Sequence, residues 1–140
     1  MKIITKTEAL KKHLNLASDE IEDKEDGRFE IGKEEWQVYT DEEADKATQD
    51  YIKESVWAFN ASSILGECGL PFSGEESLKS MQEKSCENAN DFILALVEKT
   101  CGLEQFVSDA ISADGRGHFL SGYDSEEVEL DGGYYAYRTN

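Results

Sequence analysis

The spacing of hydrophobic and polar positions along the chain predicts several helices and two β-hairpins. The longest helical pattern covers residues 40–65, where small and hydrophobic side chains recur at helical spacing from Ala44 to Phe59. Thr40 and Glu43 have the spacing of a capping box, in which each side chain accepts a hydrogen bond from the other residue's backbone N–H. We therefore expect one long helix here, with an acidic first turn and a broad buried face.

Two further helices are expected in the second half of the chain. Ser73 and Glu76 repeat the capping-box spacing, and hydrophobic residues then recur at helical spacing as far as Val97. Gly102 ends that pattern, and residues 103–111 give another helix. The hydrophobic stripes of both helices are typical of faces that pack into a core.

The N-terminal region predicts a shorter amphipathic helix within residues 5–17, with Asn15 near its end. Ser18 is placed to cap one further turn that reaches Ile21. A short helix, a break and a second turn have the order of a helix-turn-helix. The second element is almost entirely acidic, however, so it could not approach phosphate, and we exclude DNA binding through it.

Two regions alternate hydrophobic and polar residues with the period of a β-strand. In the first, residues 29–31 and 36–40 alternate on either side of a turn at 32–34. In the second, residues 128–130 lead into an Asp-Gly-Gly turn, and residues 134–139 form the returning strand. Each region reads as a hairpin with one half-buried face.

These elements predict an α+β fold that forms a single compact domain over residues 1–140. Two to three main helices are expected to pack on a small antiparallel sheet made of the two hairpins. A chain of 140 residues is long enough to bury a core without metal or disulfide crosslinks. No stretch approaches the roughly 20 apolar residues that span a bilayer, and no signal-peptide pattern begins the sequence.

Charge is the most distinctive property of the composition. Acidic residues number 31 against 14 basic ones, which gives a formal net charge of −17. Such a chain repels nucleic acid and anionic membranes and attracts proteins with basic surfaces, including the DNA-binding clefts of other proteins. Solubility alone is the alternative explanation of this charge.

The acidic residues gather in three clusters, at 19–26, 41–45 and 124–131, which alternate along the chain with aromatic residues. Neighbouring side chains on a helix lie about 5–6 Å apart, on the scale of duplex phosphate spacing, so a rigid array could imitate DNA. The aromatic residues concerned are Trp36, Tyr39, Tyr51, Tyr123, Tyr134 and Tyr135. The acidic positions that we assign to a binding surface are Asp19, Glu20, Glu22, Asp23, Glu25, Asp26, Asp41, Glu42, Glu43, Asp45, Asp124, Glu126, Glu127, Glu129 and Asp131.

Motifs for catalysis, metals and cofactors are weak by comparison. His118, in the glycine-rich stretch 114–124, is the best general-base candidate by residue type, but no nucleophile motif accompanies it. That stretch lacks the order of a dinucleotide-binding loop, and residues 124–131 do not match an EF-hand. The three cysteines have no metal-ligand spacing and are expected to be reduced cytoplasmic thiols. We therefore expect no catalytic residue, no metal and no cofactor.

Three segments together resemble small acidic proteins of tailed bacteriophages and prophages. They are TEALKKHLNLASDEIED, VYTDEEADKATQDYIKESVWAFNAS and DGRGHFLSGYDSEEVELDGGYYAYRTN, which occur in the same order and cover about half of the chain. The resemblance implies a setting in the host cytoplasm and an accessory role. It brings no catalytic residues with it.

The sequence therefore predicts a non-enzymatic, phage-type accessory protein that binds a basic host protein through an acidic, DNA-like surface. An inhibitor of a nucleic-acid-handling or host defence enzyme is one such protein. We expect no direct contact with nucleic acid and none with membranes. Two alternatives stay open: a small enzyme centred on His118, and a structural protein of a virion or homo-oligomer.

Overall fold

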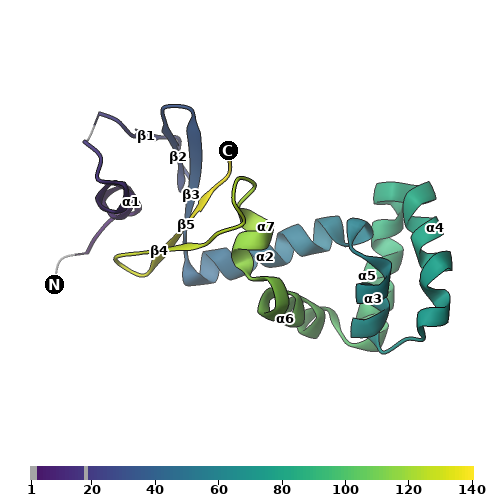
Figure 1. Ribbon diagram of the computed structural model, residues 1–140. Helices are drawn as coiled ribbons and strands as arrows, with labels where there is room; N and C mark the ends of the chain where they lie inside the picture. Colours follow the sequence, from purple (N-terminus) through teal and green to yellow (C-terminus); the bar gives the residue numbers. More distant parts are fainter. Residues whose placement is uncertain (1–2, 18) are drawn as a thin grey trace. The chain divides into compact units, whose positions relative to one another are not determined.

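The computed structural model describes residues 3–17 and 19–140 and confirms the predicted α+β class. Figure 1 shows an antiparallel sheet and a group of packed helices. The chain divides into two compact units, Met1–Thr48 with Asp114–Asn140, and Gln49–Ala113. We call them the sheet unit and the helical unit. That residues 1–140 form a single domain remains a prediction, because the contacts within each unit define two compact parts.

The sheet unit contains one antiparallel sheet of five strands in the order β1-β2-β3-β5-β4. The predicted hairpins are β2 with β3 and β4 with β5. They join into one sheet because β3 also pairs with β5, with Val38 opposite Ala136. The strands are β1 Glu22–Asp23, β2 Arg28–Ile31, β3 Glu34–Thr40, β4 Val128–Leu130 and β5 Tyr134–Arg138.

Helix α1, Lys6–Leu14, packs against β3, β4 and β5. Thr5 caps its first turn, and Asn15 ends it in the left-handed conformation. The core between helix and sheet consists of Ala9, Leu10, Phe29, Trp36, Val38, Leu130 and Ala136. Within the described residues, the indole N–H of Trp36 is the buried side-chain polar group without a hydrogen-bond partner.

The segment after α1 differs from the prediction. Ser18, the expected cap of a further turn, lies outside the described residues. Ile21 is not helical, and the next two residues form β1, in which Asp23 pairs with Phe29. The Asp23 carboxylate accepts a hydrogen bond from the backbone N–H of Glu25 at 2.8 Å, which favours a turn over a helix.

Helix α7, Arg116–Leu120, and the first half of helix α2, Asp41–Ser55, as far as Thr48, also belong to the sheet unit. Helix α2 begins directly after β3, and its predicted capping box is confirmed by Glu43 N–H to Thr40 at 3.2 Å and Thr40 N–H to Glu43 at 2.9 Å. Helix α7 occupies the region predicted as a glycine-rich loop. Its Gly117 lies so close to the backbone of residues 125–127 that a Cβ atom would overlap it.

The helical unit contains shorter helices than the sequence predicts. They are η1 Val56–Ala58, α3 Ala61–Cys68, η2 Phe72–Gly74, α4 Glu75–Ser85, η3 Cys86–Ala89, α5 Asn90–Thr100 and α6 Leu103–Asp114, the last residue of which belongs to the sheet unit. The prediction of two to three main helices is therefore too coarse. Only α6 has the limits expected of its pattern, with Gly102 before it in the left-handed region.

The helix predicted over 40–65 is interrupted. Helix α2 ends at Ser55, Phe59 is extended, and Asn60 caps α3 through hydrogen bonds from the backbone N–H groups of Ser62 and Ser63. An asparagine side chain can accept hydrogen bonds from the free backbone N–H groups at a helix start, whereas in a helix interior it has no such groups to bind. This local capping outweighs the continuous hydrophobic periodicity.

The helix predicted from Ser73 to Val97 is also wrong in two respects. Its start is not a capping box, because α4 follows Gly74, which makes no side-chain cap. Its middle is interrupted at Cys86, which has a φ of 49° and leads through η3 into α5. Cysteine rarely adopts a positive φ, so the sequence gives no signal that the helix breaks at Cys86.

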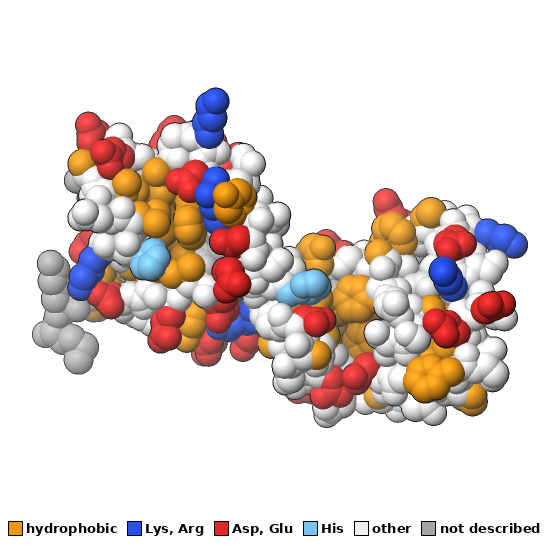
Figure 2. All heavy atoms as spheres, viewed as in Figure 1, with side chains coloured by type: hydrophobic (Ala, Val, Ile, Leu, Met, Phe, Trp, Pro, Cys, Tyr) orange, Lys and Arg blue, Asp and Glu red, His pale blue; other side chains and the backbone are white. Residues whose placement is uncertain are grey.

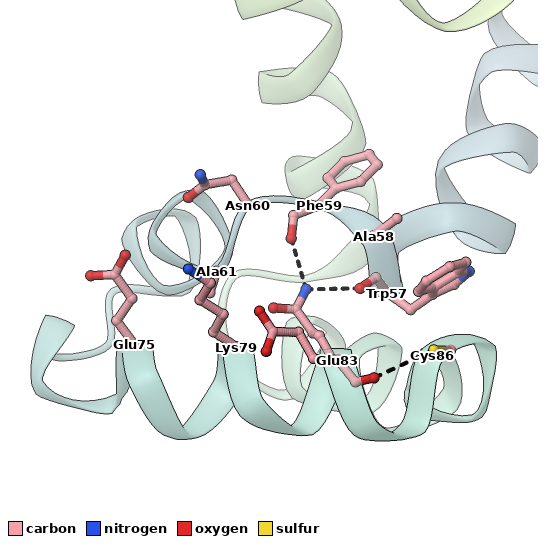
Figure 3. Close-up of a pocket in the computed structure, with 10 residues that line it drawn as sticks. Trp57, Ala58, Phe59, Asn60, Ala61, Glu75, Lys79, Glu83 and Cys86 are labelled. Carbon is pink, nitrogen blue, oxygen red and sulfur yellow. Dashed lines mark hydrogen bonds between the residues drawn. The ribbon is translucent and has the colours of Figure 1, made fainter.

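Gln82 of α4 fixes the irregular segment that follows η1. Its side-chain amide donates to the carbonyl oxygens of Trp57 at 2.8 Å and Phe59 at 2.7 Å, drawn as dashed lines in Figure 3. These bonds lie beside an open groove of about 380 Å³, so water can reach the segment.

We expect the substitution Gln82→Met to lower the free energy of unfolding by about 1–2 kcal/mol. Two carbonyl groups lose their donor, and water from the groove replaces part of that loss. Glu83→Met, on the next and exposed position, is the matched control and should change stability by less than about 0.5 kcal/mol. Chemical denaturation followed by circular dichroism measures both. Equal effects of the two variants would contradict the role given to Gln82.

Candidate functional site

Every acidic residue that the sequence assigns to a binding surface is exposed, and all of them belong to the sheet unit. The cluster at 19–26 covers β1 and the turn into β2. The cluster at 41–45 is the first turn of α2, and the cluster at 124–131 begins after α7 and ends one residue past β4. The structure thus gathers three separate sequence segments on one folded unit.

Arg116 of α7 brings two of these clusters together. Its guanidinium donates to the Asp41 carboxylate at 2.9 Å, to Asp45 at 3.0 Å and to Glu127 at 2.7 Å, and it also reaches the Asp41 carbonyl oxygen at 3.1 Å. The same group lies 4.7 Å from the centre of the Tyr135 ring. One cation therefore connects the start of α2, the segment before β4, and β5.

Arg116 is a mostly buried cation surrounded by three more exposed carboxylates. Its side chain is only 10% exposed, whereas those of Asp41, Asp45 and Glu127 are 66%, 62% and 30% exposed. Burial opposes the charge, but the hydrogen bonds that the guanidinium donates to Glu127 and Asp41 outweigh burial and raise the pKa of Arg116. Arg116 is therefore a permanent cation at the centre of the three carboxylates.

Tyr137 of β5 completes this cluster. Its buried hydroxyl donates to the Glu127 carboxylate, and its ring lies 6.0 Å from that of Tyr39. Burial first, and then the bond to Glu127, raise the pKa of this phenol well above its usual range. The phenol therefore remains a neutral donor at any physiological pH, which suits a structural bond.

Other cations neutralise further acids of the predicted surface. Lys6 pairs with Glu43 at 2.7 Å, Lys12 with Asp131 at 2.5 Å, and Lys24 with Glu22 at 3.0 Å. The first two contacts connect α1 to the start of α2 and to the β4–β5 turn, and the third is local to β1. The acids in them contribute to the fold, and their charge is partly cancelled toward solvent.

A different set of acids faces solvent without such a pair. Glu42 on α2 and Glu129 on β4 are exposed, and no cation among residues 3–17 and 19–140 forms an ion pair with either. Figure 2 shows acidic side chains of the sheet unit in several separate groups, with hydrophobic and uncharged side chains between them. On the face drawn, the acidic side chains of the sheet unit thus form separate groups and not one continuous patch.

His118 lies on α7 and not in a loop, and its side chain is exposed. Its ring meets Phe119 edge-on at 4.9 Å. Neighbouring groups that could orient it are used elsewhere: Asp124 accepts from the Ser121 hydroxyl at 2.8 Å, and Arg116 is held by the three carboxylates. Among residues 3–17 and 19–140, the His118 side chain makes no hydrogen bond that would orient it as a general base.

In residues 3–17 and 19–140, no three or more His, Cys, Asp or Glu side chains are grouped as metal ligands would be. Across the same residues, no helix combines the length and apolar character that a membrane crossing requires.

The sequence interpretation missed Arg116 and Tyr137 as the centre of the site. Arg116 is the single lysine or arginine between Lys99 and Arg138. A lone arginine in so acidic a segment is a signal for ion pairing that could have been used. Comparison with known protein families, with curated proteins and with solved structures found no match.

Proposed function

We propose that the sheet unit is a non-enzymatic binding module whose unpaired surface acids engage a basic host protein that handles nucleic acid. The observation that supports this proposal is the exposure of every predicted acidic residue on one folded unit. The phage origin, the host-cytoplasm setting and the DNA-like character of the surface belong to the proposal. Its partner is a protein, and the module touches neither nucleic acid nor membrane.

The ion pairs divide the acids into two roles. Asp41, Asp45 and Glu127 hold Arg116 and stabilise the unit. Acids without a pair, such as Glu42 and Glu129, keep their full charge for a partner. A basic cleft would meet these charges as it meets phosphates, and salt would weaken the contact.

The test changes one acid in each cluster that forms no ion pair in the structure. A tagged protein carrying Asp19→Lys, Glu42→Lys and Glu129→Lys is compared with the unchanged protein in capture experiments from bacterial lysate, eluted with a salt step. We expect the captured nucleic-acid-handling protein to bind at least tenfold more weakly to the variant. DNA should displace that protein from the unchanged module.

The matched control alters the charge equally in the helical unit, through Glu54→Lys, Glu83→Lys and Glu87→Lys, all at exposed positions. It should retain binding. Equal loss in both triple variants would show that net charge alone acts, and full binding by the first variant would defeat the proposal. Circular dichroism of both variants confirms that the fold is retained.

One observation favours the alternative role in a virion or homo-oligomer. In the helical unit, the large hydrophobic side chains of Phe72 and Phe92 are 62% and 57% exposed. Sedimentation equilibrium separates the two roles, since a structural protein would have a solution mass that is a multiple of the chain mass.

A further inference from the structure

Two cysteines of the helical unit lie at the same end of two packed helices. Cys68 is the last residue of α3, and Cys101 directly follows α5. Helices α3 and α5 pack against each other, and Figure 1 shows them running in the same direction, so that their C-terminal ends lie together. The topology thus brings together two thiols that are far apart in the sequence.

Both thiols are unoxidised in the structure, and their surroundings differ. Cys68 is buried, with 8% exposure, whereas Cys101 is partly exposed and its thiol donates weakly to the Val97 carbonyl at 3.8 Å. Because α3 and α5 pack with these ends together, the two cysteines lie on adjacent helix ends.

Cys101 is open to small reagents from solvent. It lines a groove of about 420 Å³ together with Gly102, Leu103 and Ser108. The third cysteine, Cys86, is exposed but lies in η3, ahead of α5. Eleven residues of α5 separate the two ends by about 16 Å, so Cys86 is too far from Cys101 to compete with Cys68.

We propose that Cys68 and Cys101 are a peroxide-responsive pair that forms a reversible disulfide between the C-terminal ends of α3 and α5. The Cys101 thiolate attacks hydrogen peroxide, which gives a sulfenic acid and releases hydroxide. The Cys68 thiol then attacks the sulfenic sulfur, the S–S bond forms, and water leaves. Peroxide is the oxidant that takes up the two electrons, and a small thiol reductant restores both cysteines.

The groove explains the order of these steps. Peroxide reaches the partly exposed Cys101 first, and the buried Cys68 is the resolving thiol, protected from direct oxidation. Burial first, and the neighbouring Cys68, raise the pKa of the Cys101 thiol, so the reaction is slower than at a low-pKa sensor cysteine. The disulfide would link the two ends of the segment 68–101, which contains α4 and α5.

The experiment uses the full chain with Cys86→Ser, treated with hydrogen peroxide, then denatured and alkylated. Trypsin places the two cysteines in different peptides, 54–79 and 100–116, because cleavage follows Lys53, Lys79, Lys99 and Arg116. We expect both thiols to become unavailable for alkylation and the two peptides to be linked, at a mass lower than their sum by two hydrogen atoms. Dithiothreitol should restore both thiols.

The control repeats the treatment on the unchanged chain, where Cys86 competes in peptide 85–99. The linked pair should still be 54–79 with 100–116, while Cys86 remains available for alkylation. Linkage to peptide 85–99, crosslinking between chains, or over-oxidation of Cys101 without linkage would each overturn the proposal. None of these outcomes depends on a variant of Cys68 or Cys101 folding correctly.

Discussion

Replacing Arg116 with methionine is expected to lower the free energy of unfolding by about 2–3 kcal/mol. Removing one partner of a buried ion pair costs about 3–5 kcal/mol, because the remaining charges lose their compensation. The loss is smaller here, since Asp41 and Asp45 are more than half exposed and water can hydrate them. Urea denaturation followed by circular dichroism measures the change.

Arg28→Met is the matched control, because Arg28 is an exposed arginine on β2 of the same unit. It should change stability by less than about 0.5 kcal/mol. Arg116→Lys should fall between the two, because lysine restores the charge but cannot donate to three carboxylates in the geometry of a guanidinium. If the two methionine variants were equally stable, the central role of Arg116 would be refuted.

Gly117→Ala is expected to destabilise the chain by about 2 kcal/mol, although alanine normally favours a helix. The added Cβ would lie 2.6 Å from the Ser125 carbonyl oxygen and from the Glu126 carbonyl carbon, and 2.8 Å from the Glu127 nitrogen. Overpacking costs about 1–3 kcal/mol, and more where only backbone can move. That cost outweighs the helix-propensity gain of about 1 kcal/mol.

Gly66→Ala in α3 is the control, and it should change stability in the opposite direction to Gly117→Ala. Its Cβ would meet only the end of the Phe72 ring, at an ordinary 3.7 Å. We expect a gain in stability of up to about 1 kcal/mol. Thermal melting of the two alanine variants checks both, and a stabilised Gly117→Ala protein would show that α7 can move away from residues 125–127.

Local rules predicted the parts of the fold that depend on neighbouring residues. The capping box of Thr40 and Glu43 and both hairpins were found because turn and capping signals act within a few residues. The breaks at Phe59 and Cys86 were missed because hydrophobic periodicity continues across both. The position of such a break depends on tertiary hydrogen bonds, such as the one from the Gln82 side chain to the Phe59 carbonyl oxygen.

The sequence predicted which acidic residues are exposed, but it did not predict which of them form ion pairs. Exposure of the acidic clusters follows from their charge, because unpaired carboxylates are rarely buried. Their pairing does not, since Arg116 reaches Asp41 across 75 positions of sequence. Only the pairing of β3 with β5, itself between distant segments, places α7 beside the first turn of α2. The sequence therefore could not separate structural acids from those available to a partner.

The order of strands also has a kinetic meaning. The helical unit is continuous in sequence, and its helices meet neighbours a short distance away along the chain. The sheet unit needs β3 to find β5, which closes a loop that contains the entire helical unit. Loop entropy must be lost before such distant contacts stabilise anything, so these contacts form slowly. We therefore expect the helices to assemble early and the Arg116 cluster, which joins residues 41–45 to residue 127, to form late.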